Sequence, residues 1–149
     1  MGYFLAVFSP DTHAAFSASD RRVMGFRERH RKAAAKVGAG DLLVCYLTGL
    51  SRWVGLLRVE GSAYDDATPR FAPADDPFIV RMTVSPVVWL AADDGVAIRD
   101  DEVWQALSFT KAHEKRSSKW TGSLRTSLAP VKPEDGLVIE RVLRDRQGA

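Results

Sequence analysis

The sequence has one cysteine, three histidines and no long hydrophobic run, and each shortage excludes a kind of protein. Cys45 alone cannot form an intramolecular disulfide or a multi-cysteine zinc site, and it fits the reducing cytoplasm. No apolar stretch approaches the roughly 18 residues that span a bilayer, so we expect no membrane segment. The first residues show neither a secretory leader nor the Ser or Thr that an N-myristoylation motif requires, because position 6 is Ala6.

Catalytic and cofactor motifs are also missing. His13, His30 and His113 lie far apart and show no metal-ligand spacing, so we predict no metal site. The sequence has no G-x-S-x-G elbow, no phosphate-binding GxxxxGK[ST] loop and no GxGxxG fingerprint, and we therefore predict no cofactor. Adjacent aspartates such as Asp75 and Asp76 fall in predicted loops or caps, which favours solvation or capping over acid–base chemistry.

A length of 149 residues predicts one domain over residues 1–149, with the last five residues or so frayed. Apolar or alternating patterns predict strands over residues 2–8, 42–47, 53–61 and 78–84, with a continuation over 87–90. The strand over 42–47 is apolar at every position, which indicates that both of its faces are covered. These elements, with a few helices, predict a small α+β domain around a curved sheet or partial barrel.

Three helices are expected. Ser9-Pro10 should end the first strand, and Ser19 should cap a short helix from Asp20 that Gly25 interrupts. Its predicted buried residues are Val23 and Met24.

The second helix should follow the N-cap Asp100 and bury Val103, Trp104 and Leu107. The third should begin near Pro133, with an apolar stripe made of Val138, Ile139, Val142 and Leu143.

Positive charge is concentrated in two segments although the net charge is only +2. Residues 21–36 carry seven Lys or Arg against Glu28 alone, and residues 111–125 carry five against Glu114 alone. One interpretation is a single positive face that attracts an anionic partner. The other is two solvated stretches that never meet.

Large rings lie beside turns and basic segments. Tyr46 and Trp53 flank the turn of one predicted hairpin, and Phe26 and Trp120 lie next to the basic segments. An aromatic ring that stacks on a nucleobase contributes about 1–3 kcal/mol, and arginines and lysines contact phosphates. Rings plus cations therefore predict a site for one extruded base. Core packing is the alternative for every ring, and it is the preferred interpretation for Trp89 and Trp104 at core spacing.

Several motifs occur in an order that resembles a known family. "VGAGDLLVCYLTGLSRWVGLLRVEGSAYDD" is similar to the glycine-aspartate, strand, turn and acidic-loop core of EVE domains, members of the PUA-like superfamily with the YTH and ASCH domains. "YFLAVFSP", "FIVRMTVSPVVWL" and "LSFTKAHEKRSSKWTGSLRTSLAPVKPEDGLVI" resemble the opening strand, the strand with its arginine and proline, and the closing stretch. The resemblance implies a PUA-like pseudo-barrel of five or six mainly antiparallel strands with flanking short helices.

The resemblance also implies a pocket for a modified nucleobase, walled by aromatic side chains, in DNA or RNA. The base-binding residues expected from the resemblance and from the rings are Ser9, Pro10, Phe26, Arg27, Tyr46, Leu47, Thr48, Trp53, Trp120 and Ser123. The expected phosphate-binding residues are Arg29, Arg31, Lys32, Lys111, Lys115, Arg116, Lys119 and Arg125. Many EVE domains carry a tryptophan near the first helix, where this sequence has Phe26.

Three functions stay open. The first is a non-catalytic reader of a modified base, which implies nucleic acid as the partner. EVE-type modules often act with restriction or RNA-modification machinery, so these are candidate partners. The second is an ASCH-like amide hydrolase of modified nucleosides that uses Lys111, Glu114 and Thr110. The third is a tRNA- or rRNA-binding module that requires no base modification.

Overall fold

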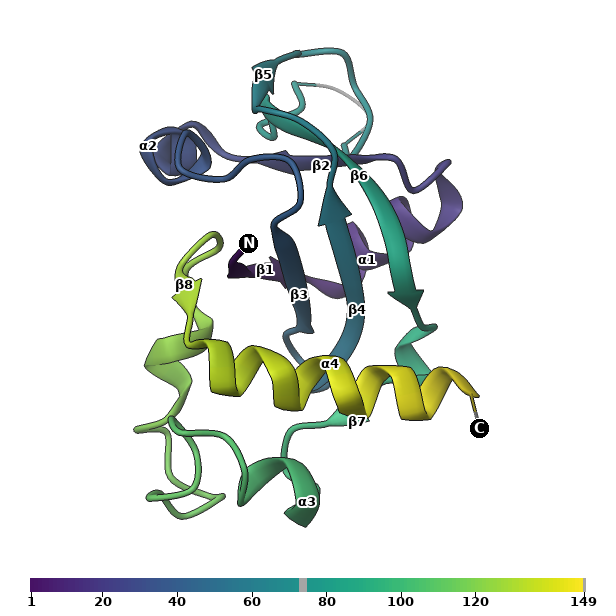
Figure 1. Cartoon of the computed structure of the whole chain (residues 1–149). Coiled ribbons are helices and arrows are strands. Elements are labelled where there is room, and N and C mark those ends of the chain that lie inside the picture. The colour runs from purple at the N-terminus through teal and green to yellow at the C-terminus, as the bar shows by residue number, and fades with distance from the viewer. Residues whose placement is uncertain (73–74, 149) are drawn as a thin grey trace.

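The computed structural model describes residues 1–72 and 75–148. Its helices and strands, in chain order, are β1 (Tyr3–Phe8), α1 (Pro10–Ala18), β2 (Val23–Phe26), η1 (Glu28–His30), α2 (Arg31–Ala34), β3 (Leu42–Leu47), β4 (Arg52–Val59), β5 (Tyr64–Asp65), β6 (Val80–Trp89), η2 (Ala92–Asp94), β7 (Val96–Ala97), α3 (Asp101–Trp104), η3 (Thr121–Leu124), β8 (Pro130–Val131) and α4 (Pro133–Gly148). Figure 1 shows a curled sheet with α4 across one face.

The sheet follows the strand order β2-β6-β4-β3-β1-β8, with the two-residue strands β5 and β7 at its sides. β1 and β3 pair in parallel, and all the other pairs are antiparallel. The predicted α+β architecture, a mainly antiparallel half-barrel with short flanking helices, is therefore confirmed. Among the described residues, no helix is both long enough and apolar enough to cross a membrane.

Two hydrophobic clusters cover the two faces of the sheet. α4 contributes Ile139, Val142 and Leu143 to the first cluster, as the predicted stripe requires. α1 contributes Phe16 to the second cluster, where Val54 packs from β4. β3 is buried at all six positions because both clusters lie against it, which confirms the expectation from its uninterrupted apolar run.

The region between β1 and β3 corrects the sequence-based interpretation. Ser9 follows the first strand, as expected, and it is also the N-cap of α1. Its hydroxyl accepts a hydrogen bond from the Thr12 N–H at 3.2 Å, and Pro10 lies in the first turn of the helix. The predicted helix from Asp20 is wrong, because residues 23–26 form strand β2 against β6. Pairing with a distant strand determined the structure of this short segment, where local propensity is weak.

The expected continuation of the strand beyond Pro86 is observed, because β6 runs to Trp89 with a register shift opposite Leu56 and Leu57 that accommodates the proline. The last boundary differs from the sequence-based expectation. α4 begins at Pro133 as predicted and continues to Gly148, through the residues expected to fray. Ala149 lies outside the described residues.

Candidate functional site

A cavity of about 190 Å³ lies between α1, β2 and the β5–β6 loop (described residues 66–72 and 75–79), and we call it the α1–β2 cavity. Its lining residues are Val7, Phe8, Ser9, Thr12, Met24, Gly25, Arg27, Phe71 and Phe78. A cavity of roughly 150 Å³ holds a benzene ring, so this one is large enough for a small planar heterocycle.

A smaller hollow of about 120 Å³ adjoins the α1–β2 cavity and shares Val7, Gly25, Arg27 and Phe78 with it. The residues it adds are Phe26, Arg29, His30, Arg125 and Ser127. The two hollows lie where the sheet stays open, because β2 is one end of the strand order and β1 lies next to the other end. The Val7 N–H donates to the Ser127 hydroxyl at 3.0 Å instead of to a strand, which fixes the 125–127 segment beside this opening.

Two phenylalanines form an aromatic wall of the α1–β2 cavity. The Phe71 and Phe78 rings meet edge to face, with centroids 5.8 Å apart. Gly25 lies against both rings, because a Cβ placed there would be 2.4 Å from the Phe71 ring and 2.8 Å from Phe78 Cβ. The absence of a side chain at this position in β2 therefore allows the rings to approach the sheet.

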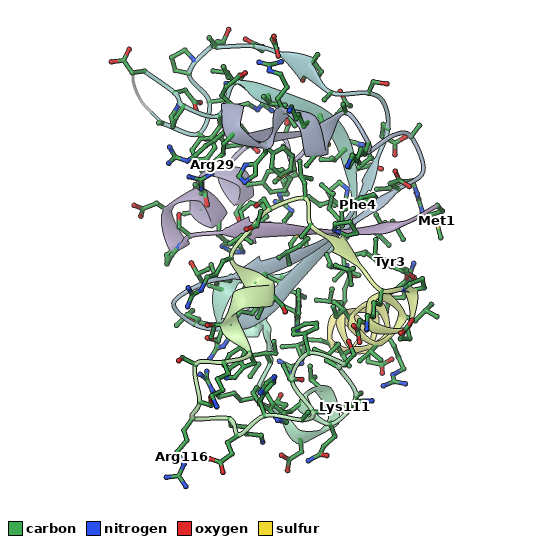
Figure 2. The ribbon with its side chains drawn as sticks, turned by 90° about the vertical axis from the view of Figure 1, so that its left-hand side faces the viewer. Met1, Tyr3, Phe4, Arg29, Lys111 and Arg116 are labelled. Atoms are coloured by element: carbon green, nitrogen blue, oxygen red, sulfur yellow. The ribbon has the colours of Figure 1, made fainter. Side chains whose placement is uncertain are left out.

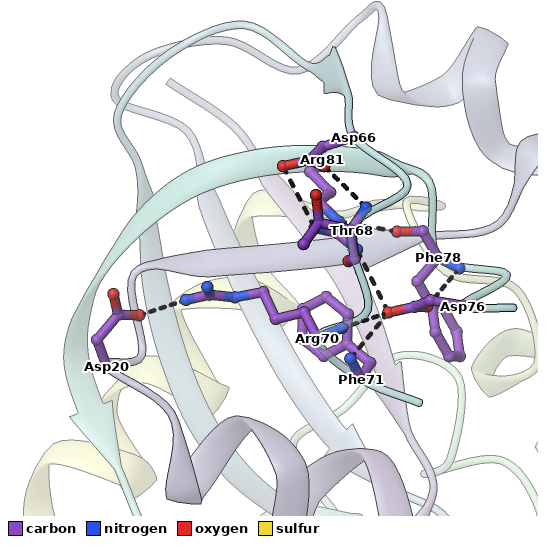
Figure 3. A network of polar contacts seen from close by, with 8 residues as sticks. All are labelled: Asp20, Asp66, Thr68, Arg70, Phe71, Asp76, Phe78 and Arg81. Carbon is purple, nitrogen blue, oxygen red and sulfur yellow. Dashed lines mark hydrogen bonds and ion pairs between the residues drawn. The ribbon is translucent and has the colours of Figure 1, made fainter. Parts of the chain in front are cut away.

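A buried carboxylate holds the loop that carries these rings (Figure 3). Asp76 Oδ2 accepts hydrogen bonds of 2.9 Å from the backbone N–H groups of Arg70 and Phe71, and Oδ1 accepts one from the Phe78 N–H at 2.9 Å. Burial alone would raise the pKa of Asp76, but these bonds and the Arg81 charge outweigh burial and keep the pKa below its usual value. Both rings are thus fixed through their own backbone amides.

Hydroxyl groups line the α1 side of the cavity. Ser9 and Thr12 belong to the capping box of α1, in which the Ser9 N–H donates to Thr12 Oγ1 at 2.9 Å. The capping box uses part of the donor and acceptor capacity of each hydroxyl, and what is left can meet the polar edge of a heterocycle.

Three arginines, Arg27, Arg29 and Arg125, line the two hollows. Burial lowers the pKa of the neighbouring His30, and the charges of Arg29 and Arg27 lower it further. The buried Nδ1 of His30 has no hydrogen-bond partner within the described residues. The rim of the site is therefore positive, and a negatively charged group would be stabilised there.

The structure brings five of the sequence-predicted residues to this place: Ser9, Phe26, Arg27, Arg29 and Arg125. Pro10 follows directly at the start of α1. Thr48 lies at the same end of the sheet, where its N–H donates to the Phe8 carbonyl at 2.9 Å, and Leu47 before it is fully buried. Ser9 and Arg125 are 116 positions apart in the sequence, and only the fold brings them together.

All four predicted rings lie in the core, because Phe26 is 3% exposed and belongs to the second hydrophobic cluster even though it borders the adjoining hollow. Tyr46 and Trp53 pack edge to face with centroids 5.1 Å apart, and Trp120 packs in the same manner on Trp104. Tyr46 is 4% exposed, Trp53 0% and Trp120 2%, and none of the three lines the α1–β2 cavity; Trp53 lines a separate cavity under α4. Tyr46 and Trp53, which flank the β3–β4 turn, both belong to the first hydrophobic cluster.

The two basic segments contribute unequally to the site. Figure 2 shows Lys111 and Arg116 at the end of the molecule away from Arg29, so residues 111–119 do not join the arginine rim. In that stretch Lys115 pairs with Asp101, while Arg116 is 94% exposed. Lys119 is exposed as well.

In the first basic segment Arg31 binds Glu28 and Asp65, at 2.5 and 2.6 Å, which neutralises its charge, and Lys32 is exposed.

The three residues of the hydrolase alternative differ in burial. Thr110 is fully buried and donates its hydroxyl hydrogen bond to the Trp104 carbonyl at 2.8 Å, whereas Lys111 and Glu114 are exposed.

Sequence reasoning missed seven of the nine residues that line the cavity: Val7, Phe8, Thr12, Met24, Gly25, Phe71 and Phe78. The sequence pattern places Met24 in a helix that does not form and predicts Phe78 as the first residue of a strand that begins at Val80. The glycine in the middle of β2 was the one available signal, because a glycine within a strand often marks the close approach of another group.

A second cavity, of about 310 Å³, lies under α4 and contains the remaining predicted residues Trp53 and Ser123. We call it the α4 cavity, and its other lining residues are Leu5, Ser108, Phe109, Leu124, Pro130, Val131, Lys132, Asp135 and Ile139. Asp135 is 2% exposed and accepts hydrogen bonds from the Ser108 N–H and hydroxyl at 2.8 and 2.5 Å. A buried carboxylate beside Lys132 gives this cavity a less positive lining than the α1–β2 cavity and its adjoining hollow, which together carry Arg27, Arg29 and Arg125.

The chain belongs to the EVE domain family, whose model matches residues 2–142. No curated protein matches it. The described residues contain no group of three or more His, Cys, Asp or Glu side chains placed to hold a metal ion.

Solved structures share the fold at low sequence identity. The YTH domain of Pho92, solved in complex with m6A, has a TM-score of 0.67 and 12% identity, over 96% of this chain and 83% of that one. The YTH domain of Zygosaccharomyces rouxii MRB1, solved with N6-methyladenosine RNA, has a TM-score of 0.64 and 10% identity, over 98% and 86% of the two chains. A Pseudomonas putida protein has a TM-score of 0.58 and 19% identity, over 94% and 98%.

Proposed function

We propose that this EVE domain is a non-catalytic module that binds nucleic acid and accepts one modified base, turned out of its strand, in the α1–β2 cavity. The observation that carries the proposal is the combination of the Phe71 and Phe78 wall with the rim of Arg27, Arg29 and Arg125. Flat rings stack on a base, and arginines contact the adjoining phosphates.

Two further observations support the proposal. The YTH domains of Pho92 and MRB1, which share the fold, were solved with m6A and with N6-methyladenosine RNA. The α1–β2 cavity suits an anionic strand better than the larger α4 cavity does, because Asp135 would repel phosphate from the latter.

The test is a binding panel measured by fluorescence anisotropy at two salt concentrations. It compares RNA and DNA, single and double strands, and each sequence with and without a modified base such as N6-methyladenine. Tighter binding of one modified strand supports the proposal. Equal binding of every modified and unmodified pair would indicate the alternative module without modification specificity.

Two variants locate the site. Phe78→Ala should weaken binding of the preferred strand by about 5- to 150-fold, which corresponds to the loss of one stacking contact. Phe109→Ala removes the same ring from the α4 cavity and should leave binding unchanged. A loss of binding in Phe109→Ala with none in Phe78→Ala would move the site to the α4 cavity.

Two arginine variants separate the rim from the distant basic loop. Arg29→Ala should reduce the salt dependence of binding to a single strand by about 0.7 in log–log slope, the value for one lost phosphate contact. Arg116→Ala tests the phosphate-binding set predicted in residues 111–119, and an unchanged slope there would exclude that residue from the interface.

A further inference from the structure

Each ring of the α1–β2 cavity wall already holds a guanidinium group on one face. The Arg27 guanidinium carbon is 4.9 Å from the centroid of the Phe78 ring, and that of Arg81 is 5.6 Å from the centroid of the Phe71 ring. Both distances lie within the roughly 6 Å over which a cation is attracted to an aromatic face.

This arrangement changes the ligand charge that the rings favour. An unoccupied aromatic cage attracts cations, and proteins use such cages to bind methylated ammonium groups. Here arginines occupy that role. The Arg81 charge is paired with Asp66 and Asp76, but Arg27 has no carboxylate partner among the described residues, so a positively charged base against the Phe78 ring would meet the like charge of Arg27. Like-charge contacts at an interface reduce affinity substantially.

The lining offers no compensating negative charge. Among the described residues that line the α1–β2 cavity and its adjoining hollow, none is Asp or Glu, whereas Arg27, Arg29 and Arg125 are all present. Asp76 supports the loop, but its oxygens accept hydrogen bonds from three backbone N–H groups, and Arg81 lies 3.3 Å from Oδ2. The lowered pKa of His30, caused by burial and then by Arg29 and Arg27, agrees with a positive potential at this place.

We infer that the α1–β2 cavity selects modified bases that are uncharged and excludes methylated bases that carry a positive charge. The inference rests on the proposed function and adds the substrate class. Arg29 and Arg125 attract the phosphates of the strand, while the cavity that the two rings line accepts a neutral heterocycle.

Positional isomers test the inference, because they carry one methyl group on the same base and differ in charge through one added proton. One oligonucleotide sequence is prepared with unmodified adenine, with N6-methyladenine, which is neutral, or with 1-methyladenine, which is cationic at neutral pH. A second set uses cytosine, N4-methylcytosine and the cationic 3-methylcytosine. In at least one set, the neutral isomer should bind at least about tenfold more tightly than the cationic isomer. Equal or tighter binding of the cationic isomer in both sets would overturn the inference and leave the proposed function standing.

A charge variant separates repulsion from shape. Arg27→Gln removes the cation over Phe78, so the ratio of neutral to cationic affinity should fall severalfold, even if both affinities decrease. The matched control Arg141→Gln removes an exposed arginine from α4 and should leave the ratio unchanged. An unchanged ratio in Arg27→Gln would overturn the inference, because shape would then account for the selectivity.

If neither modified isomer in either set bound more tightly than its unmodified strand, the proposed function would fail, and this inference with it.

Discussion

Asp76 and Arg81 form a buried ion pair, with 3.3 Å between Asp76 Oδ2 and an Arg81 guanidinium nitrogen. Their side chains are 0% and 2% exposed, and the Arg81 guanidinium also donates to the carbonyl of Phe78 at 3.1 Å. Figure 3 shows both residues at the centre of a network that holds Phe71 and Phe78. The pair therefore links the stability of the β5–β6 loop to the shape of the α1–β2 cavity.

Asp76→Ala should lower the free energy of unfolding by about 3–5 kcal/mol, because three backbone N–H groups lose their acceptor and the buried Arg81 keeps only the partly exposed Asp66 as a carboxylate partner. Urea unfolding followed by circular dichroism measures the change. Asp101→Ala, which removes an exposed ion pair with Lys115, should leave stability nearly unchanged. Equal effects of the two substitutions would contradict a structural role for the buried pair.

Stability should fall in acid, partly through Asp76. Its folded pKa lies below the unfolded value of about 3.9, so the native state holds fewer protons than the unfolded chain in this range. The contribution is therefore present above about pH 4 and is lost as the pH falls through the folded pKa. Free energies of unfolding measured between about pH 5 and pH 2 should decrease less steeply in Asp76→Asn, whose amide does not titrate. An acid slope identical to that of the parent would show that another group is responsible.

Gly25→Ala should displace the aromatic wall, because its Cβ would lie 2.4 Å from the Phe71 ring. Overpacking of this kind costs about 1–3 kcal/mol of stability, and we expect a loss of at least tenfold in affinity for the preferred oligonucleotide. Thermal unfolding and anisotropy measure the two effects. The control Gly61→Ala adds the same methyl group at a position with nothing within 4 Å of the new Cβ. A Gly25→Ala protein that binds like the parent would show that the rings are not part of the site.

Trp120→Ala and Arg125→Ala should separate stability from binding, although the two residues are close in sequence. Trp120 is 2% exposed and packs on Trp104, so its truncation should cost about 3–5 kcal/mol of unfolding free energy. Arg125 is exposed and bonds the Thr121 hydroxyl at 3.1 Å, so its loss should weaken oligonucleotide binding and hardly change stability. A stable Trp120→Ala protein with impaired binding would reverse this assignment.

Much of the fold could be predicted from the chain because strand and helix periodicity is local. The apolar run 42–47, the alternation beyond residue 78 and the stripe of the last helix gave β3, β6 and α4 close to their observed bounds. β2 could not be predicted in this way, because its four residues become a strand only by pairing with β6, more than fifty positions away. The order of the family motifs provided the overall architecture.

The amino-acid sequence by itself determined the buried strands, the absence of familiar catalytic motifs and the supply of rings and cations, because composition and local pattern contain this information. Only the tertiary structure decided which aromatic rings line the α1–β2 cavity and which pack in the hydrophobic core. It buried Tyr46, Trp53 and Trp120, and it brought Phe71, Phe78 and Arg125 to the open edge of the sheet. The physical reason is that a cavity forms between segments distant in sequence, where packing density and a buried ion pair, rather than residue type, determine which ring faces remain uncovered.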